Sequence, residues 1–306
     1  MTSLLAALAL LTPTADDASA TASSDPPADA VGEPVALIGD DLSGWSGSVD
    51  DWTVEDGVLI GRTDGSLKMN RFIWADIEPV KNFVLTSDVW ISAGGNSGIQ
   101  YRSKLRPDLG PFRMQGSQCD VVSNNDNYNG MLYEEMGRRI VGRTGRVVVI
   151  DADGQPWVNE TLEVKSFPPE QWHTYTIEAR GNHLVHKIDG TVTADLVDLD
   201  AANRMLEGKL GVQTHVGAPM EIRYRNMTLT RLLDDLPMTD RAVADAAEKV
   251  VPQGGWPKKK TPTKGPKKNP KKSLKKGPNK GPNKGPNKGS KKNQEAGNAP
   301  AKATAN

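Results

Sequence analysis

The stretch that decides the class of fold is residues 171–190, QWHTYTIEARGNHLVHKIDG. Polar and apolar residues alternate in two segments of it, 172–180 and 183–188. Side chains two residues apart on a strand point to the same face, so this period of two predicts two strands. Asp189 and Gly190 follow as a pair that is typical of a tight turn. The stretch therefore predicts antiparallel β-structure.

The same pattern recurs through residues 34–233, which we interpret as one domain. Turn signals such as Asp56-Gly57 and Asp153-Gly154 separate the segments. No convincing amphipathic helix precedes residue 238. Many short strands with turns roughly every ten residues are typical of a β-sandwich or jelly roll, so we expect an all-β fold. The other predicted strands are 58–62, 72–75, 83–92, 97–103, 118–122, 146–150, 209–216 and 220–230.

One helix is predicted, over residues 238–251, MTDRAVADAAEKVV. Thr239 is a suitable N-cap, the alanines favour helix, and Pro252 with Gly254 would end it. We therefore expect a short C-terminal helix after the sandwich.

The net charge of zero hides two oppositely charged parts. From residue 258 to the end there are 16 lysines and one acid, Glu295, which gives +15 and leaves −15 for the rest. Residues 257–306 contain Pro and Gly every few positions, including three successive GPNK units, and almost nothing apolar to bury. We expect a disordered basic tail that contacts a polyanion, such as an acidic envelope polymer, an anionic membrane or nucleic acid, with a solubilising spacer as the alternative.

The N-terminal residues have the pattern of a secretory signal. MTSLLAALALL is apolar, and Ala18-Ser19-Ala20 fits a cleavage site, so residues 1–20 are predicted to be a signal peptide. Residues 21–33 are predicted to be a disordered linker. The apolar run is too short to span a bilayer, and no transmembrane segment is expected. Export to the periplasm or the medium is the expected fate, and the single Cys119 excludes an internal disulfide.

Chemistry-bearing residues concentrate in residues 116–139, GSQCDVVSNNDNYNGMLYEEMGRR. On the strand 118–122, Gln118 and Asp120 share one face, and Cys119 lies on the other. Acids and arginines crowd the following loop. Arginines there either orient carboxylates or grip an oxygen-rich ligand, but a solvated loop with weak surface ion pairs is an equal alternative.

Two other predicted strands repeat the polar pair. If the three strands are neighbours, their side chains form one face rich in amide, guanidinium and imidazole groups, which suits the recognition of hydroxyls and carbonyls; an ordinary solvated sheet face is the alternative. His215 is the best acid/base candidate. Motifs for serine hydrolases, zinc proteases and nucleotide binding are absent. The pairs are Gln100 with Arg102, Gln118 with Asp120, and Gln213 with His215.

Several ordered motifs resemble one known family. NSGIQYRS (96–103), the stretch 116–139, the stretch 171–190 and GKLGVQTHVGAPMEIRYRNMTL (208–229) are similar to the 3-keto-disaccharide hydrolase domain family, over about residues 37–232. The resemblance implies a concanavalin-like jelly-roll sandwich in an exported protein that cleaves glycosides oxidised to a ketone at C3.

A C3 ketone acidifies the proton on C2, so a base can remove that proton and expel the group at C1. Such a site needs a base, a stabiliser for the enolate oxygen, which in some relatives is a divalent metal, and a proton donor. The resemblance implies Asp120 or His215 as the base, with Glu135 and Arg138 binding or orienting the sugar. The site residues that it implies are Arg102, Gln118, Asp120, Tyr133, Glu135, Arg138, Gln213 and His215.

Two other functions remain open at this point. A sandwich of this kind can bind carbohydrate without cleaving it, and an inert sandwich can serve as an envelope scaffold that the basic tail attaches. A binding module should present exposed aromatic rings. The predicted face is polar and acidic instead, which favours catalysis.

Overall fold

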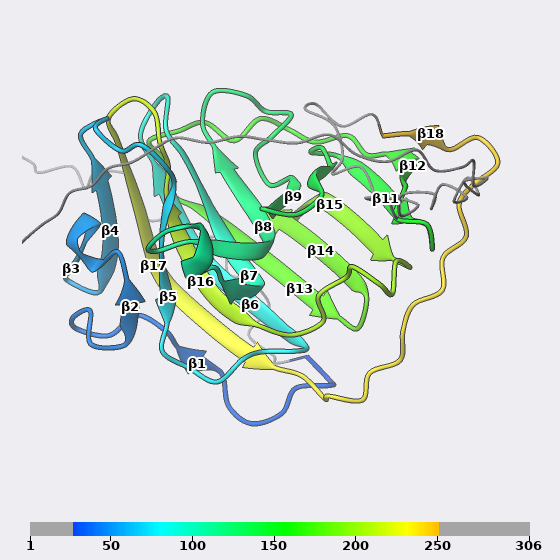
Figure 1. Cartoon of the computed structure of the whole chain (residues 1–306), viewed down its shortest axis with the longest axis horizontal. Helices are drawn as coiled ribbons and strands as arrows, with labels where there is room; N and C mark the ends of the chain where they lie inside the picture. The colour runs from blue at the N-terminus through cyan, green and yellow to red at the C-terminus, as the bar shows by residue number, and fades with distance from the viewer. Residues whose placement is uncertain (1–26, 251–306) are drawn as a thin grey trace, which may run out of the picture. The chain divides into compact units, whose positions relative to one another are not determined.

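The computed structural model describes residues 27–250, which fold into two β-sheets packed face to face (Figure 1). Apart from two single-turn 3-10 helices, Val49–Asp51 and Pro107–Leu109, the regular elements of this range are strands. Neighbouring strands run antiparallel except β11 and β15. The predicted all-β jelly-roll sandwich is confirmed.

The larger sheet has eleven strands. Its central strands are amphipathic, as in β13, where every second residue from Tyr175 to Ala179 is buried. In spatial order the sheet contains β18 (Glu248–Lys249), β12 (Pro156–Thr161), β11 (Arg146–Ile150), β15 (Thr191–Asp198), β14 (His183–Ile188), β13 (His173–Arg180), β6 (Phe83–Ile91), β17 (Met220–Arg231), β4 (Val58–Thr63) and β3 (Trp52–Glu55), with β1 (Val35–Ala36) beside β17.

The smaller sheet has seven strands and carries the polar motifs. Its central strand β7 is buried almost along its whole length, because the core covers one face and polar side chains crowd the other. In spatial order it contains β10 (Arg139–Gly142), β9 (Leu132–Glu135), β8 (Met114–Val122), β7 (Asn96–Leu105), β16 (Lys209–Thr214), β5 (Arg71–Ala75) and β2 (Trp45–Gly47).

The core lies between the sheets. Ile99, Cys119 and Val121 of the smaller sheet pack into the same buried cluster as Leu85 and Ile177 of the larger one, all at most 2% exposed. The expected alternation on β8 is therefore confirmed: Cys119 faces the core, and its neighbours Gln118 and Asp120 face away from it. Burial of this apolar surface is the main force that holds the sheets together.

All ten predicted strands are present, with ends shifted by at most four residues. The predicted helix over residues 238–251 is wrong for the part that the structure describes. Its backbone is satisfied by the sandwich instead: Asn182 exchanges hydrogen bonds with Thr239, Asn159 does so with residues 242 and 244, and β18 pairs with β12. The segment has no apolar stripe that a helix could pack against the sandwich. Its contacts with the sandwich therefore outweigh the helix propensity of its alanines.

The predicted domain boundary needs a correction at the N-terminus. Residues 27–33 fall within the expected disordered linker 21–33, yet Ala30 bridges to Leu232 and Asp29 pairs with Arg180. The start of the linker, the predicted signal peptide 1–20 and the basic tail 257–306 lie outside the described residues.

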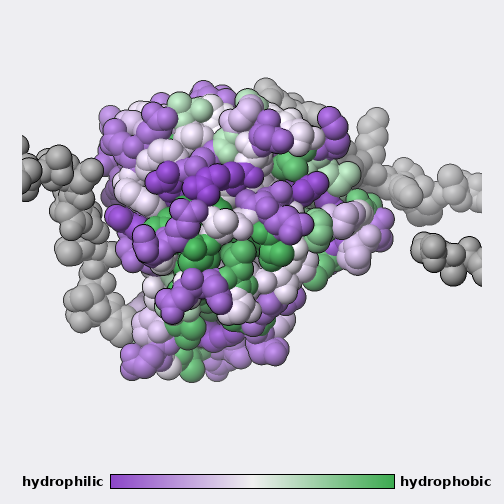
Figure 2. Space-filling view, turned by 90° about the vertical axis from the view of Figure 1, so that its left-hand side faces the viewer, coloured by the Kyte–Doolittle hydropathy of each residue, from purple (hydrophilic) through white to green (hydrophobic). Residues whose placement is uncertain are grey.

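One face of the domain, seen in Figure 2, is mainly hydrophilic around a smaller group of hydrophobic residues. Over residues 27–250, none of the helical turns is long and apolar enough to cross a membrane.

Candidate active site

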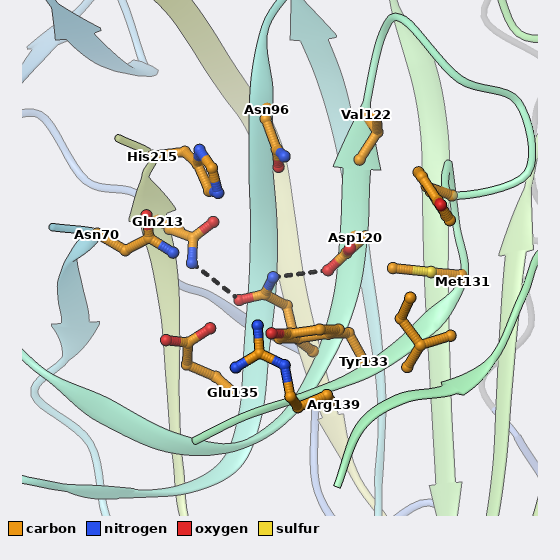
Figure 3. Close-up of a pocket in the computed structure, with 13 residues that line it drawn as sticks. Asn70, Asn96, Asp120, Val122, Met131, Tyr133, Glu135, Arg139, Gln213 and His215 are labelled. Atoms are coloured by element: carbon orange, nitrogen blue, oxygen red, sulfur yellow. Dashed lines mark hydrogen bonds between the residues drawn. The ribbon is translucent and has the colours of Figure 1, made fainter. Parts of the chain in front are cut away.

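A cavity of about 310 Å³ opens on the face of the smaller sheet that points away from the core (Figure 3). This volume is near the lower end of the roughly 300–1,000 Å³ that is usual for small-molecule sites. Six strands or the loops beside them contribute to its wall. The polar lining residues are Asn70, Asn96, Gln118, Asp120, Glu135, Arg139, Gln213 and His215, and the apolar and aromatic ones are Val122, Tyr128, Met131, Tyr133 and Ile140.

Strand register explains why residues far apart in sequence meet here. Directly paired residues of antiparallel strands share a face. Gly98 of β7 pairs with Asp120 of β8, and Gln118 of β8 pairs with Tyr133 of β9. On the other side of β7, β16 brings Gln213 to the same face. The sequence prediction that these polar pairs form one surface is correct for β8 and β16.

A glycine makes room for the central amide. A Cβ atom at Gly98 would lie 2.4 Å from Cδ of Gln118, closer than any real contact allows. The Gln118 side chain therefore lies flat across β7. From there its Nε2 donates to Oδ1 of Asp120 at 2.6 Å, and its Oε1 accepts from Nε2 of Gln213 at 3.3 Å. The three side chains form one hydrogen-bonded row across the floor of the cavity.

Asp120 is held in its protonated form at neutral pH. It is 6% exposed. Burial raises the pKa of its carboxyl to about 8, the negative charge of Glu135 adds to this, and the hydrogen bond from Gln118 opposes it. A carboxylic acid with a pKa near the working pH is suited to donating a proton.

The pKa of His215 is shifted in the opposite direction to that of Asp120. Burial lowers the pKa of its imidazole below the usual value of 6.5, so the ring is neutral at pH 7 and able to accept a proton. In Figure 3 it lies on the β16 side of the cavity together with Asn70 and Gln213, whereas Asp120 lies on β8. One strand, β7, separates β16 from β8, which sets their backbones about 10 Å apart.

Glu135 closes the lower side of the cavity in Figure 3. Burial raises the pKa of its carboxyl, and the nearby guanidinium groups of Arg113 and Arg139 oppose that shift. Arg113 donates to Oε1 of Glu135 at 3.3 Å and to the backbone oxygen of Asn70 at 2.7 Å. Arg113 thus orients two residues of the cavity wall without lining it. Burial also raises the pKa of the half-buried Tyr133 to about 12.

Two predicted site residues lie elsewhere. Arg102 has a positive φ of 43° at a bulge of β7, which breaks the alternation and turns its side chain away from Gln100. Its guanidinium donates to the backbone oxygens of Lys81 and Gly181 and to Oδ1 of Asn82. Arg102 therefore connects the two sheets and does not line the cavity, contrary to its predicted place in the site.

Arg138 is the second correction. It is 8% exposed and pairs with Glu134, Asp198 and Asp200, so it links the turn after β9 to the larger sheet. Its neighbour Arg139 lines the cavity instead, with its guanidinium 5.8 Å from the ring centre of Tyr133. Among residues 27–250 Arg139 has no ion-pair partner. Adjacent residues point to opposite sides. The Arg-Arg pair in the sequence therefore predicted an arginine at the cavity but did not indicate which of the two it is.

Sequence reasoning also missed two asparagines. Asn96 lies two residues before Gly98 and hence on the same face, a signal within the motif 96–103. Asn70 comes before the short strand β5 and had no local signal. Its Oδ1 accepts a hydrogen bond from the backbone N–H of Val216 at 3.0 Å, which directs its amide nitrogen into the cavity (Figure 3).

The residues present do not form a protein-based metal centre. Asp120, Glu135 and His215 line one cavity, but within residues 27–250 no three side chains of His, Cys, Asp or Glu converge closely enough to hold an ion. We therefore derive no step of a reaction through a metal.

Comparison with known proteins places these motifs in one family model. The model describes a 3-keto-alpha-glucoside-1,2-lyase-like domain and matches residues 33–230. No curated protein matches the sequence.

Among solved structures, a chain from Parabacteroides distasonis described as a candidate glycosyl hydrolase is 17% identical, with a TM-score of 0.45 over 66% of this chain and 100% of its own. A second from the same organism is 21% identical, with a TM-score of 0.44 over 65% and 94%. A β-glucanase of Bacillus licheniformis is 10% identical, with a TM-score of 0.38 over 64% and 95%.

Proposed function

The chain belongs to the 3-keto-alpha-glucoside-1,2-lyase-like domain family, and from that premise we propose that it cleaves 3-keto-α-glucosides by eliminating the group at C1. The observation that carries the proposal is the pairing of a neutral imidazole with a protonated carboxyl in one small cavity. His215 is the proposed base, and Asp120 is the proposed proton donor. A non-catalytic carbohydrate-binding module has no need of such a pair.

The reaction balances with these two groups. Nε2 or Nδ1 of His215 takes the proton from C2, and the electron pair of that C–H bond forms the enolate of the C3 ketone. The enolate collapses to a C1–C2 double bond while the C1–O bond breaks, and the leaving oxygen takes the proton of Asp120. The products are an unsaturated ketosugar and an alcohol. Water can then add across the double bond.

The enolate oxygen needs a hydrogen-bond donor while it carries charge. Asn70 is the best candidate, because its amide nitrogen points into the cavity on the same side as His215 and its oxygen is already engaged by Val216. Arg139 supplies a positive charge at the lower rim, where it also favours an electron-rich ligand. The row of Gln213 and Gln118 holds Asp120 in place.

The signal pattern of residues 1–20 supports a site of action outside the cytoplasm, and the charge of residues 257–306 supports attachment to a polyanion there. The direct test is to incubate the full chain with 3-keto-trehalose and follow the products by mass spectrometry. Release of glucose together with the unsaturated ketosugar or its hydrate is expected. Binding of the ketosugar without release of either product would support the carbohydrate-binding alternative instead.

A further inference from the structure

The cavity is divided into a polar and an apolar half, with Asp120 on the border between them. In Figure 3, His215, Gln213 and Asn70 lie on one side of Asp120, and Met131 and Val122 lie on the other. The polar half comes from β16 and the residues beside it and from Asn70 before β5, whereas the apolar half comes from Val122 at the end of β8, Met131 before β9 and Ile140 of β10; Glu135 and Arg139 lie at the lower rim.

The apolar half offers very few hydrogen-bonding groups. Val122, Met131 and Ile140 have none in their side chains, and Ile140 pairs with Tyr133, so both share the same face. The backbone groups nearest Asp120 are already used: its N–H donates to the oxygen of Met131, and its oxygen accepts from the N–H of Gly130.

Two tyrosines, Tyr128 and Tyr133, border this half. The hydroxyl of Tyr133 points toward the side of Glu135, away from Met131 (Figure 3). The hydroxyl of Tyr128 accepts from Arg143 at 3.4 Å, and the same guanidinium lies 5.1 Å from its ring centre. Both rings therefore contribute apolar surface.

We infer that the apolar half is the subsite of the leaving group, and that it selects glycosides with an apolar leaving group over disaccharides. This inference rests on the proposed function. A proton donor at the border requires the breaking C1–O bond to lie above Asp120, with the ketosugar over the polar half. A second sugar ring placed over Met131 and Ile140 would leave several hydroxyls without partners, which costs binding energy, whereas a hydrocarbon ring of the same size gains it.

A matched pair of substrates tests this selection. Cyclohexyl 3-keto-α-glucoside carries a six-membered ring without hydroxyls in the place of the leaving glucose of 3-keto-trehalose. Cyclohexanol is the poorer leaving group, so intrinsic reactivity works against the expected result. We expect kcat/KM to be at least tenfold higher for the cyclohexyl compound. Equal values, or a preference for 3-keto-trehalose, would overturn the inference while leaving the proposed function intact.

A variant ties the preference to this half of the cavity. Ile140→Asn should reduce the ratio of the two kcat/KM values at least fivefold. The matched control is Val84→Asn, a half-buried apolar residue of β6 in the larger sheet, which should leave the ratio unchanged. An unchanged ratio in a folded Ile140→Asn protein would contradict the assignment.

Measuring the binding of unreactive glycosides tests the apolar subsite independently of the elimination reaction. Cyclohexyl α-glucoside and trehalose lack the ketone and cannot undergo elimination, so their Kd values report the subsite alone. We expect the cyclohexyl compound to bind at least fivefold more tightly to the full chain, and this advantage to be lost in Ile140→Asn. If neither ketosugar is cleaved, the proposed function is wrong. The ratio of the Kd values for cyclohexyl α-glucoside and trehalose still shows whether the cavity has an apolar subsite.

Discussion

Gln118 donates a hydrogen bond of 2.6 Å to the carboxyl of Asp120, two residues further along β8, and receives one of 3.3 Å from Gln213 on β16. This row fixes the orientation of Asp120 on a rigid sheet rather than on a loop. Preorganised groups of this kind lose little freedom when a reaction begins. The amides of Gln118 and Gln213 therefore position the acid.

The first prediction concerns the pH dependence of kcat/KM on 3-keto-trehalose. The rate should rise on the acid side as His215 loses its proton, because burial places its pKa below the usual 6.5. It should fall again near pH 8 as Asp120 ionises. Asp120→Asn should lower kcat/KM by roughly 10²–10⁴-fold, the usual contribution of an acid or base. The matched control is Asp153→Asn, in an exposed turn, which should have no effect. Activity that keeps rising above pH 9 would contradict the role of Asp120.

The second prediction is that the wild type is less stable than Asp120→Asn at neutral pH, and that this difference grows as the pH rises. Its pKa is about 8 when folded and near 3.8 in an unfolded chain, so the folded state binds the proton more tightly. The stability that Asp120 contributes is therefore fully present below pH 4 and is lost as the pH rises through 8. Relative to the wild type, Asp120→Asn should gain at most about 1.4 kcal/mol in free energy of unfolding per pH unit between 4 and 8. Urea unfolding at pH 4, 6 and 8 measures this gain. A difference independent of pH would show that Asp120 is ionised in the folded protein.

The third prediction tests the space above Gly98. Gly98→Ala places a Cβ atom 2.4 Å from Cδ of Gln118, so the amide must move and its hydrogen bond to Asp120 is lost. We expect kcat/KM to fall about tenfold or more, with a loss of about 1–3 kcal/mol in stability from overpacking. Gly39→Ala is the matched control, because its Cβ meets nothing within 4 Å. Full activity in Gly98→Ala would show that the row of amides is not needed.

The fourth prediction separates two adjacent arginines. Arg138→Met removes the partner of buried Asp198 and should cost about 3–5 kcal/mol in free energy of unfolding. Arg139→Met should change stability by no more than about 0.5 kcal/mol but raise KM for the ketosugar. Thermal unfolding and steady-state kinetics on both variants check this contrast. The reverse assignment of effects would restore Arg138 to the site.

The fifth prediction concerns the tail. With 16 lysines and one acid, residues 257–306 should retain the protein on an anionic polymer in a salt-dependent manner, because binding releases counterions. Deleting these residues should abolish the retention without changing kcat/KM. Retention that is insensitive to salt would count against an electrostatic contact.

Local alternation was enough to predict the sandwich, because a strand with one face in the core must repeat every two residues. The strands that escaped prediction include the short strands β2, β3, β9 and β10, and also β12 and β15. Their places depend on partners distant in sequence, such as the parallel pairing of β15 with β11. The helix error over residues 238–251 has the same cause, since Asn182 and Asn159 determine that backbone from a distance.

The residues of the site also fall into those that local alternation predicts and those that depend on distant contacts. Gln118, Asp120, Gln213 and His215 follow from alternation along two strands, and the structure brings all four to one cavity. The position of Arg102 depends on a bulge, and the choice between Arg138 and Arg139 depends on a turn. Asn70 reaches the cavity only through the register of the sheet. No local pattern specifies such features.

The central claim is that His215 removes the proton at C2, and isotope labelling tests it most directly. The substrate is 3-keto-trehalose deuterated at C2, incubated in ordinary water with the wild type and with His215→Ala, alongside a sample without protein to subtract spontaneous exchange. We expect the wild type to release glucose and a ketosugar product that has lost its deuterium, and His215→Ala to release neither. Release of a ketosugar product that retains the deuterium would mean direct hydrolysis and would contradict the mechanism.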